Sequence, residues 1–384
     1  MRRRTFVSLV GGTALAPLGA LPVHAAPSDG CGVPVARADG WPVASIDDDK
    51  PIDRGTLCRM ADRLEASGAS VHAVLVARGG KLVFERYFHG PDEINNRRIR
   101  HVDFGVDTLH DMKSVSKSVA SLALGIAIDR GLIGSVNEPI FSFFPELSDL
   151  RTPEKDRIQL VHALTMSMGL EWVEATPATG DDDNDEARMN RASDPCRYVL
   201  GRLRVTAPPG QEFFYNTGAL ALVSAIVRKA TGHPLDEFAR ATLFEPMGIT
   251  GVEWLRRRGN TDAGGGLRLR PRDMIKIGQI VLAGGRWNGR QIVSRDWIET
   301  STAPKIRTAD GSYGYLWWLG RSLLEGRAVH WTAALGRGGQ SIRIVPELDA
   351  VVAVTAGYYQ DYSPQAFQVQ YGVFRDVLRA LPPG

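Results

Sequence analysis

The chain has 384 residues, of which 43% are apolar and 23% are charged, a composition typical of globular proteins and unlike that of disordered or fibrous ones. The formal net charge is only +3 and the arginines are scattered, which excludes a basic stripe that would bind nucleic acid. No segment repeats at a period of roughly 20–50 residues, so solenoids and propellers are excluded as well.

Residues 1–25 have the features of an export signal, with a basic start, an apolar middle and a small-residue exit. The run Arg3-Arg4-Thr5-Phe6-Val7 fits the twin-arginine pattern, and Val23-His24-Ala25 offers a cleavage site before Ala26. The alternative is a membrane anchor, which the glycines and prolines of this segment disfavour. We therefore expect a twin-arginine signal peptide, an exported chain in the periplasm or outside the cell, and a mature net charge close to zero.

Three cysteines, Cys31, Cys58 and Cys196, are too few for a disulfide scaffold. Export permits a bridge, and Cys31 and Cys58 are placed to tie down an N-terminal arm over residues 26–54. Cys196 would then be a free thiol. Three unpaired thiols are an equally good interpretation of the sequence.

Hydrophobic periodicity predicts the elements in chain order. A helix over 53–66 is followed by strands over 71–77 and 81–87, which flank Gly79-Gly80 and so predict a hairpin. The period then becomes helical, and helices are expected over 115–130, 158–166, 195–203, 220–230, 271–282 and 294–300. The chain returns to strands over 313–319, 341–345 and 350–355 and closes with a helix over about 363–380.

This order predicts an α+β fold, an antiparallel sheet flanked by helices with an inserted all-helical lobe. The terminal segments are expected to meet in one sheet, so the sheet part comprises about 55–110 and 225–380 and the helical lobe about 111–224. Regular strand–helix alternation is absent, which disfavours a doubly wound parallel sheet. We expect one catalytic domain over residues 55–380, with the active site between sheet and lobe.

Several kinds of site have no signal in the sequence. It lacks an HExxH motif, its eight histidines show no metal-ligand spacing, and no glycine-rich loop marks a dinucleotide or phosphate site. A GxSxG motif, which would mark the nucleophile of an α/β-hydrolase, is also missing. The acidic run over 181–186 lacks the glycine and the ligand spacing of a calcium loop, so we expect a solvated loop. We expect neither a cofactor nor a metal ion.

A serine–lysine pair is the positive signal, because Ser114-Val115-Ser116-Lys117 opens a predicted helix. Ser114 would lie at the helix N-terminus, where free N–H groups and the helix dipole favour a developing anion. Lys117 lies one turn later on the same face, and burial would lower its pKa so that it can take the serine proton. The alternative is a capping serine beside a solvated lysine, and the context must decide between the two.

Two later segments supply that context. The stretch Pro209–Gly218 is rich in turn residues and precedes a helix, so Tyr215 is expected at a loop tip, where it can transfer a leaving-group proton. A glycine-rich stretch then precedes a strand and lets a substrate approach the backbone closely enough to accept an N–H bond. It is Ala334-Leu335-Gly336-Arg337-Gly338-Gly339-Gln340.

In this order, the three elements resemble those of the penicillin-recognising serine hydrolases, which include serine β-lactamases, D,D-peptidases and related esterases and amidases. The resemblance covers roughly residues 55–380 and includes Phe214-Tyr215-Asn216-Thr217-Gly218, Gly264-Gly265-Gly266-Leu267, Gly285-Arg286-Trp287-Asn288-Gly289 and Tyr313-Gly314-Tyr315-Leu316-Trp317-Trp318. It implies that Ser114 is the acylated nucleophile, Lys117 its partner base and Tyr215 the residue that shuttles the proton.

The third motif can be aligned in two registers. In the preferred one, Ala334-Leu335-Gly336 takes the place of the Lys-Thr-Gly element of β-lactamases. The N–H of Arg337 then joins that of Ser114 in the oxyanion hole, and Gly338-Gly339 match the glycine pair that follows. The second register puts Arg337-Gly338-Gly339 in that place and keeps a cation.

Two departures from the family pattern bear on the substrate. The usual Tyr-x-Asn is Tyr215-Asn216-Thr217 here, and the preferred register lacks the cation and hydroxyl that hold a β-lactam carboxylate. This pattern is more similar to the branch of 6-aminohexanoate-dimer (nylon-oligomer) hydrolases and esterases. Further substrate contacts are expected from Asn216, Thr217, Trp172, Trp317, Trp318 and Gln340.

We therefore expect an exported serine hydrolase that cleaves an ester or a small amide through an acyl-enzyme on Ser114. A β-lactamase or D,D-carboxypeptidase is the alternative, and a non-catalytic penicillin-recognising binding module is a further one. The expected partner is a small-molecule ester or amide, with no nucleic acid and no stable membrane anchor, and the sequence gives no indication of oligomeric state.

Overall fold

The structure is a computed structural model that describes residues 31–44, 52–174, 182–202, 204–359 and 364–381. The predicted signal peptide over residues 1–25 lies outside these ranges, as does part of the N-terminal arm. Within these ranges, no helix combines the length and the apolar character that a membrane span requires.

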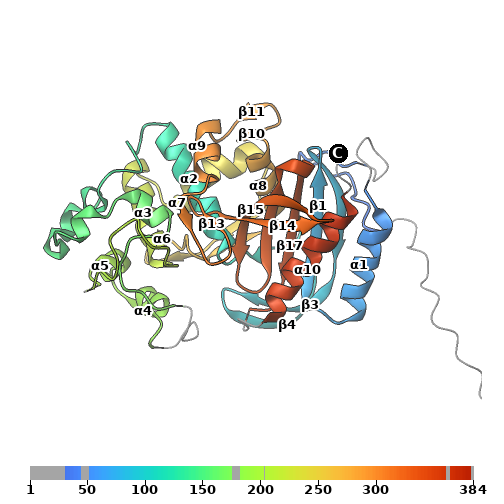
Figure 1. The fold of residues 1–384 in the computed structure, drawn as a ribbon, viewed down its shortest axis with the longest axis horizontal. Helices are drawn as coiled ribbons and strands as arrows, with labels where there is room; N and C mark the ends of the chain where they lie inside the picture. The colour runs from blue at the N-terminus through green and yellow to red at the C-terminus, as the bar shows by residue number, and fades with distance from the viewer. Residues whose placement is uncertain (1–30, 45–51, 175–181, 203, 360–363, 382–384) are drawn as a thin grey trace, which may run out of the picture.

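An eight-stranded antiparallel sheet forms one half of the molecule (Figure 1). The N-terminal strand pairs with the last strand of the chain, so that Val71 lies opposite Ala356, as the α+β prediction required. From one edge to the other, the strands are β12 (Ile306–Arg307), β13 (Ser312–Tyr313), β14 (Trp318–Leu324), β15 (Arg327–Gly336), β16 (Gln340–Val345), β17 (Ala350–Ala356), β1 (Val71–Arg78) and β2 (Lys81–Tyr87).

Helices cover both faces of this sheet (Figure 1). The terminal helices α1 (Arg54–Ala66) and α10 (Pro364–Ala380) pack together over one face, and α8 (Pro271–Leu282) and α2 (Val115–Asp129) pack on the other. Successive side chains of a strand point to opposite faces. Leu75 of β1 accordingly belongs to the core under α2 and α8, and its neighbours Val74 and Val76 belong to the core under α1 and α10.

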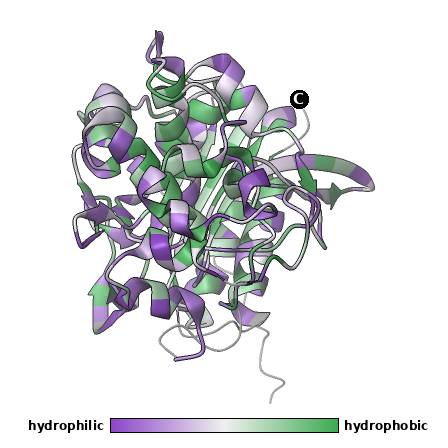
Figure 2. Ribbon diagram, turned by 90° about the vertical axis from the view of Figure 1, so that its left-hand side faces the viewer, coloured by the Kyte–Doolittle hydropathy of each residue, from purple (hydrophilic) through white to green (hydrophobic). Residues whose placement is uncertain are grey.

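The helical lobe lies beside the sheet, and its apolar segments run through its middle (Figure 2). Its longest helix after α2 is α6 (Gly218–Thr231), which ends where Gly232 adopts a φ of +75°. The lobe boundary expected at about 224 falls inside α6, and helical structure continues to Met247. The remaining lobe elements are η1 (Ile140–Ser142), η2 (Pro145–Leu150), η3 (Lys155–Arg157), α3 (Leu160–Leu164), α4 (Asp185–Arg191), α5 (Pro195–Leu200), α7 (Leu235–Ala239), η4 (Arg240–Phe244) and η5 (Glu245–Met247).

Most predicted elements are confirmed within a few residues, but the strand expected over 313–319 is not. It is broken between β13 and β14, where Leu316 adopts a φ of +66°. The sequence analysis also missed β15 and the hairpin of β3 (His89–Ile94) and β4 (Arg97–Asp103). The remaining elements are β5 (His110–Asp111), β6 (Val252–Trp254), β7 (Arg256–Arg257), β8 (Asn260–Thr261), β9 (Leu267–Leu269), β10 (Arg286–Trp287), β11 (Arg290–Gln291) and α9 (Arg295–Ser301).

A disulfide joins Cys31 to Cys58, with 6.1 Å between their Cα atoms. It ties the N-terminal arm to α1, which decides between the two interpretations that the sequence left open. Cys196 is a buried free thiol, and burial raises its pKa to about 12.

Candidate active site

The candidate nucleophile stands on a tight turn between β5 and α2. Lys113, directly before it, has a φ of +48°, a left-handed conformation that few side chains adopt. The Lys113 ammonium group anchors this turn by donating hydrogen bonds to Asn96 (2.9 Å) and Asp111 (3.1 Å). One residue after the turn, Ser116 Oγ donates to the Lys113 carbonyl oxygen at 2.6 Å. These bonds hold the backbone around Ser114 in place.

Ser114 is the N-cap residue of α2, and its hydroxyl makes no capping hydrogen bond. Lys117 Nζ lies 2.9 Å from Ser114 Oγ and 2.7 Å from the carbonyl oxygen of Gly264. The two side chains therefore lie on one face of the helix, as their spacing predicted. The carbonyl can only accept a hydrogen bond, so it holds one N–H of Lys117 and orients the nitrogen toward Ser114.

Lys117 is buried, which excludes the solvated lysine of the alternative interpretation. Burial lowers its pKa from the ordinary value, because the charged form loses its hydration, and the positive charge of Arg337 lowers it further. Three carboxylates, those of Glu174, Glu186 and Asp262, act in the opposite direction. Lys117 can therefore release its proton more readily than a lysine in water, and the surrounding charges determine how far its pKa is lowered.

Tyr215 lies in the loop before α6 and lines the same cleft as Ser114. Its ring stacks on Trp318 of β14, with 6.1 Å between ring centroids, and Lys117 Nζ lies 5.1 Å from the centre of the Tyr215 ring. The structure thus brings the three predicted catalytic side chains together, although they come from two distant segments of the chain.

The third motif forms the end of β15 and the turn into β16. Leu335 through Gly339 line the cleft, and Gly338 and Gly339 have φ values of +86° and +105°. At Gly336 the strand passes so close to the turn before Ser114 that an added Cβ would lie 2.5 Å from the carbonyl oxygen of Met112. This contact favours the preferred register, because the N–H of Arg337 follows directly after the point of closest approach.

Three further predicted residues line the cleft. Trp172 and Thr217 share a partner that the sequence analysis missed, the carboxylate of Glu174. It accepts hydrogen bonds from Trp172 Nε1 (2.5 Å), from the Thr217 backbone N–H (2.8 Å) and from Thr217 Oγ1 (2.9 Å). Nothing in the sequence marks Glu174, because it is not part of any of the three motifs. Trp318 forms the wall behind Tyr215.

Besides Lys117, which lies beneath the cleft, four predicted residues do not line it. Ala334 and Trp317 are fully buried in the core under α2. Asn216 is buried beside its loop, where its side-chain oxygen has no hydrogen-bond partner. Gln340 is fully buried, and its amide bonds the backbone of Ala356 in both directions, at 2.6 and 3.1 Å. The expectation that Asn216, Trp317 and Gln340 contact substrate is therefore corrected, since their side chains face the interior.

The acidic run over 181–186 is also different from its prediction. Asp182 and Asp183 are exposed, as expected, but Asp185 is buried, and its carboxylate accepts hydrogen bonds from the Val173 N–H (2.8 Å) and the Tyr198 hydroxyl (2.6 Å). Glu186, on α4, lines the cleft. Burial raises the pKa of Glu186, and the neighbouring Glu174 raises it further. Asp181 lies outside the described residues.

The cleft has a volume of about 680 Å³. It lies between the end of β15, which carries the third motif, and the helical lobe. Its walls combine aromatic and apolar side chains with a few charged ones. The aromatic walls include Trp172, Phe214, Trp318 and Trp331, and α10 contributes Phe367 and Tyr371. A cavity of this size accommodates a small organic molecule.

A Ser-x-x-Lys pair at the start of a buried helix, placed between an antiparallel sheet and a helical lobe, defines a β-lactamase-like hydrolase. The sequence model of the beta-lactamase family matches residues 58–360, and the chain belongs to this family. Its relatives include hydrolases with other substrates.

The chain is 26% identical over 329 residues to the 6-aminohexanoate-dimer hydrolase of Paenarthrobacter ureafaciens, which covers 80% of this chain and 78% of that protein. It is also 26% identical over 190 residues to esterase EstB of Burkholderia gladioli, which covers 46% of this chain and 44% of the esterase. Among solved structures, it resembles a Bacillus anthracis protein provisionally assigned as a 6-aminohexanoate-dimer hydrolase, with a TM-score of 0.68 and 22% identity over 91% of this chain and 89% of that one. This last likeness supports the fold.

Proposed function

We propose that this chain is a serine hydrolase that cleaves an ester or a small amide through an acyl-enzyme on Ser114. The observation that carries the proposal is the 2.9 Å approach of the buried Lys117 Nζ to Ser114 Oγ. A lysine with a lowered pKa at this distance can accept the hydroxyl proton as the oxygen attacks.

The proposed reaction has two halves. In the first, Ser114 Oγ attacks the substrate carbonyl while Lys117 takes the hydroxyl proton, and the oxyanion is held by the backbone N–H groups of Ser114 and Arg337. Tyr215 then delivers a proton to the leaving alcohol or amine as the carbonyl–leaving-group bond breaks. In the second half, water attacks the acyl-enzyme, loses its proton to the same pair and releases the acid with Ser114 restored.

The lining of the cleft supports a substrate with an apolar acyl chain, because Trp172, Trp318 and Leu335 flank the space next to Ser114. The carboxylates of Glu174 and Glu186 lie on the lobe side, which favours neutral or ammonium-bearing groups there over anionic ones. Carboxylesters and 6-aminohexanoate oligomers, whose hydrolysis gives two of the relatives their names, both meet these conditions.

The test is intact-mass spectrometry of the purified chain after brief exposure to p-nitrophenyl esters and to 6-aminohexanoate dimer. Wild-type protein should gain the mass of one acyl group and release p-nitrophenol in a burst, and Ser114→Ala should do neither. Ser148→Ala, an exposed serine of η2, is the matched control and should behave as the wild type. Ester turnover that persists at the wild-type rate in Ser114→Ala would overturn the proposal.

A β-lactam substrate is the second candidate, and the presence of Arg337 in the cleft favours it. A guanidinium group can bind the carboxylate that β-lactams and D,D-peptides carry. Nitrocefin separates the candidates, because β-lactamase activity predicts its hydrolysis and a loss of that hydrolysis in Arg337→Gln. The ester or amide proposal predicts no measurable turnover of nitrocefin by either protein.

We further propose that the chain is exported by the twin-arginine route, on the strength of Arg3-Arg4 and the apolar segment that follows. Replacing both arginines with lysine should leave the full-length precursor inside the cell, whereas the unchanged chain should be processed and recovered outside the cytoplasm. Recovery of the processed form from the double lysine variant would contradict this route.

A further inference from the structure

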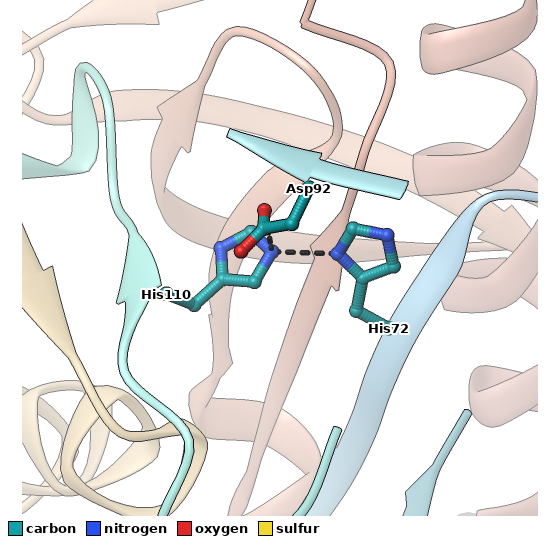
Figure 3. Close-up of side chains that lie close together, drawn as sticks. All are labelled: His72, Asp92 and His110. Atoms are coloured by element: carbon teal, nitrogen blue, oxygen red, sulfur yellow. Dashed lines mark hydrogen bonds and ion pairs between the residues drawn. The ribbon is translucent and has the colours of Figure 1, made fainter. Parts of the chain in front are cut away.

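Four polar side chains from distant parts of the chain meet behind the nucleophile turn. They are His72 of β1, Asp92 of β3, His110 of β5 and Tyr359, which follows β17 (Figure 3 shows the first three). None is more than 4% exposed, and ligand atoms of the two histidines and Asp92 all lie within 4.8 Å of one another. These two histidines show no metal-ligand spacing along the chain, because each comes from a different strand.

The His110 ring is oriented with one nitrogen lone pair toward the cluster. His110 Nδ1 lies 3.1 Å from the carbonyl oxygen of Asp111, which can only accept, so Nδ1 carries the ring proton. His110 Nε2 therefore presents its lone pair inward, 2.7 Å from His72 Nδ1 and 3.1 Å from the Tyr359 hydroxyl. A ring held by a backbone carbonyl on one nitrogen and open on the other is the usual arrangement of a metal-ligating histidine.

The Asp92 carboxylate at the centre of the cluster lacks a cationic partner among the described residues. Its polar contacts are the Tyr359 hydroxyl at 2.7 Å and the His110 ring at 3.7 Å. The Lys113 ammonium group lies 4.8 Å from the centre of the Tyr359 ring, but it bonds Asn96 and Asp111 and not Asp92. A buried carboxylate without a positive charge is costly, and a bound cation would remove that cost.

We propose that His72, Asp92, His110 and Tyr359 bind one divalent transition-metal ion, and that this ion is Zn²⁺. Two imidazoles and a carboxylate are ligands that zinc prefers, and the Tyr359 oxygen would complete a four-coordinate site. Tetrahedral ligands at zinc distances lie about 3.3 Å apart, so the two rings would separate by about 0.6 Å from their present hydrogen bond. His72 would carry its proton on Nε2, which faces Ser70 Oγ at 3.4 Å.

The ion would have a structural role. The four ligands leave no position for substrate, and the side chains are closed to solvent. The ion would link β1, β3, β5 and the segment that follows β17. Its ligand on β5, His110, lies four residues before Ser114. This proposal is independent of the proposed hydrolysis, because none of its ligands takes part in the steps at Ser114.

Metal analysis of the full chain without a histidine tag tests the proposal. Protein produced with added zinc and then dialysed should carry one zinc per chain, measured by inductively coupled plasma mass spectrometry. A strong chelator should lower its melting temperature, and added Zn²⁺ should restore it. The cobalt-loaded protein should show the visible absorption bands of tetrahedral Co²⁺.

Asp92→Asn is the decisive variant, because the amide oxygen still accepts the Tyr359 hydrogen bond but the ligand charge is gone. It should bind zinc at least about tenfold more weakly than the wild type. His330→Ala removes an exposed histidine that pairs with Glu347 and should leave the zinc content unchanged. Ser114→Ala should also keep the metal, which separates this result from the test of catalysis.

Two results would overturn the proposal. One is wild-type protein that stays metal-free after exposure to zinc, manganese and iron(II), with a melting temperature that neither chelator nor metal changes; the cluster is then a hydrogen-bonded network. The other is equal zinc content in the wild type and Asp92→Asn, which would place the ion elsewhere on the chain. The wild-type melting measurements decide the first point even if Asp92→Asn does not fold.

Discussion

Lys117 lies beneath the cleft among opposing charges, and this setting determines what the residue can do. The Ser-x-x-Lys spacing already predicted that Ser114 and Lys117 share a helix face. The spacing could not predict the charges around Lys117, because Glu174, Glu186 and Arg337 come from three other segments. At the scale of single residues, the Ser114–Lys117 pair is therefore set by a local sequence motif, whereas the charges that shift the pKa of Lys117 come from distant segments.

Lys117 should control the pH dependence of acylation. Because its pKa is lowered, its neutral, proton-accepting form appears at a lower pH than for an ordinary lysine, and the acylation rate should rise with pH through that pKa to a plateau. On that plateau, Lys117→Arg should lower the acylation rate by about 10²–10⁴, because a guanidinium group does not give up its proton. Stopped-flow release of p-nitrophenol measures both, with the exposed Lys305→Arg as the control. A Lys117→Arg variant with the wild-type pH profile would contradict the role.

Glu186 and Arg337 should move that pH profile in opposite directions. Removing the negative charge in Glu186→Gln lowers the pKa of Lys117 further, so the acylation midpoint should fall. Removing the positive charge in Arg337→Gln raises it, so the midpoint should rise, each by up to about one pH unit. The readout is the midpoint of single-turnover acylation against pH, and Glu237→Gln, in the helical lobe, serves as the neutral comparison. Shifts in the same direction for the two variants would contradict this account of Lys117.

At the scale of elements, the hairpin of β15 and β16 brings the proposed oxyanion donor, the Arg337 N–H, to Ser114. Gly336 permits this because its backbone touches the carbonyl of Met112, two residues before Ser114. The side chain of Gln370 on α10 fastens the hairpin from the other face by donating to the Gln340 carbonyl at 2.9 Å. The position of the Arg337 N–H thus depends on a helix formed by the last described residues of the chain.

Gly336→Ala should weaken both catalysis and stability. The added methyl group would lie 2.5 Å from the Met112 carbonyl oxygen and must push β15 away from Ser114. We expect kcat/KM to fall at least about tenfold, with a loss of about 1–3 kcal/mol in the free energy of unfolding. Gly372→Ala is the control, because nothing lies within 4 Å of an added Cβ there and the change favours helix α10. A kcat/KM at the wild-type value in Gly336→Ala would show that the close approach of Gly336 to Met112 does not determine the position of the hairpin relative to Ser114.

The elements that the sequence predicted well are those whose period and end signals agree. Examples are α2, and α6 with its terminal Gly232. The misses have physical causes. Leu316 takes a left-handed conformation inside an apolar run. Bulky residues rarely adopt this conformation, so the sequence does not indicate it. Gln340 and Asn216 belong to the right motifs but point inward, and only packing against other segments decides which way a side chain faces.

At the scale of the whole molecule, the Cys31–Cys58 disulfide holds the N-terminal arm against α1. The bridge closes a loop with a sequence separation of 27 residues, which limits the freedom of the unfolded chain. The arm also contacts the body through Asp39, which accepts a hydrogen bond from the buried Arg272 at 3.1 Å. The arm is therefore part of the folded domain.

Reduction of this disulfide should destabilise the protein by about 2–4 kcal/mol. A Cys31→Ala/Cys58→Ala double variant should show the same loss without reductant, and its melting temperature should no longer respond to reductant. The measurement is thermal unfolding with and without reducing agent. Cys196→Ala removes the free thiol and should keep the full response of the wild type. A wild-type melting temperature that reductant leaves unchanged would contradict a stabilising bridge.

The pairing of β1 with β17 brings together strands from opposite ends of the domain, with Val71 opposite Ala356. Contacts between such distant residues form slowly, because the long chain segment between them loses conformational entropy before the contacts can stabilise the fold. A ribosome-bound chain cannot complete the middle of its sheet, and neither can a fragment that stops before β17. The serine at residue 114 and the hairpin at residue 337 consequently meet only in the folded domain, so the partly made chain carries the proposed nucleophile without the proposed oxyanion site.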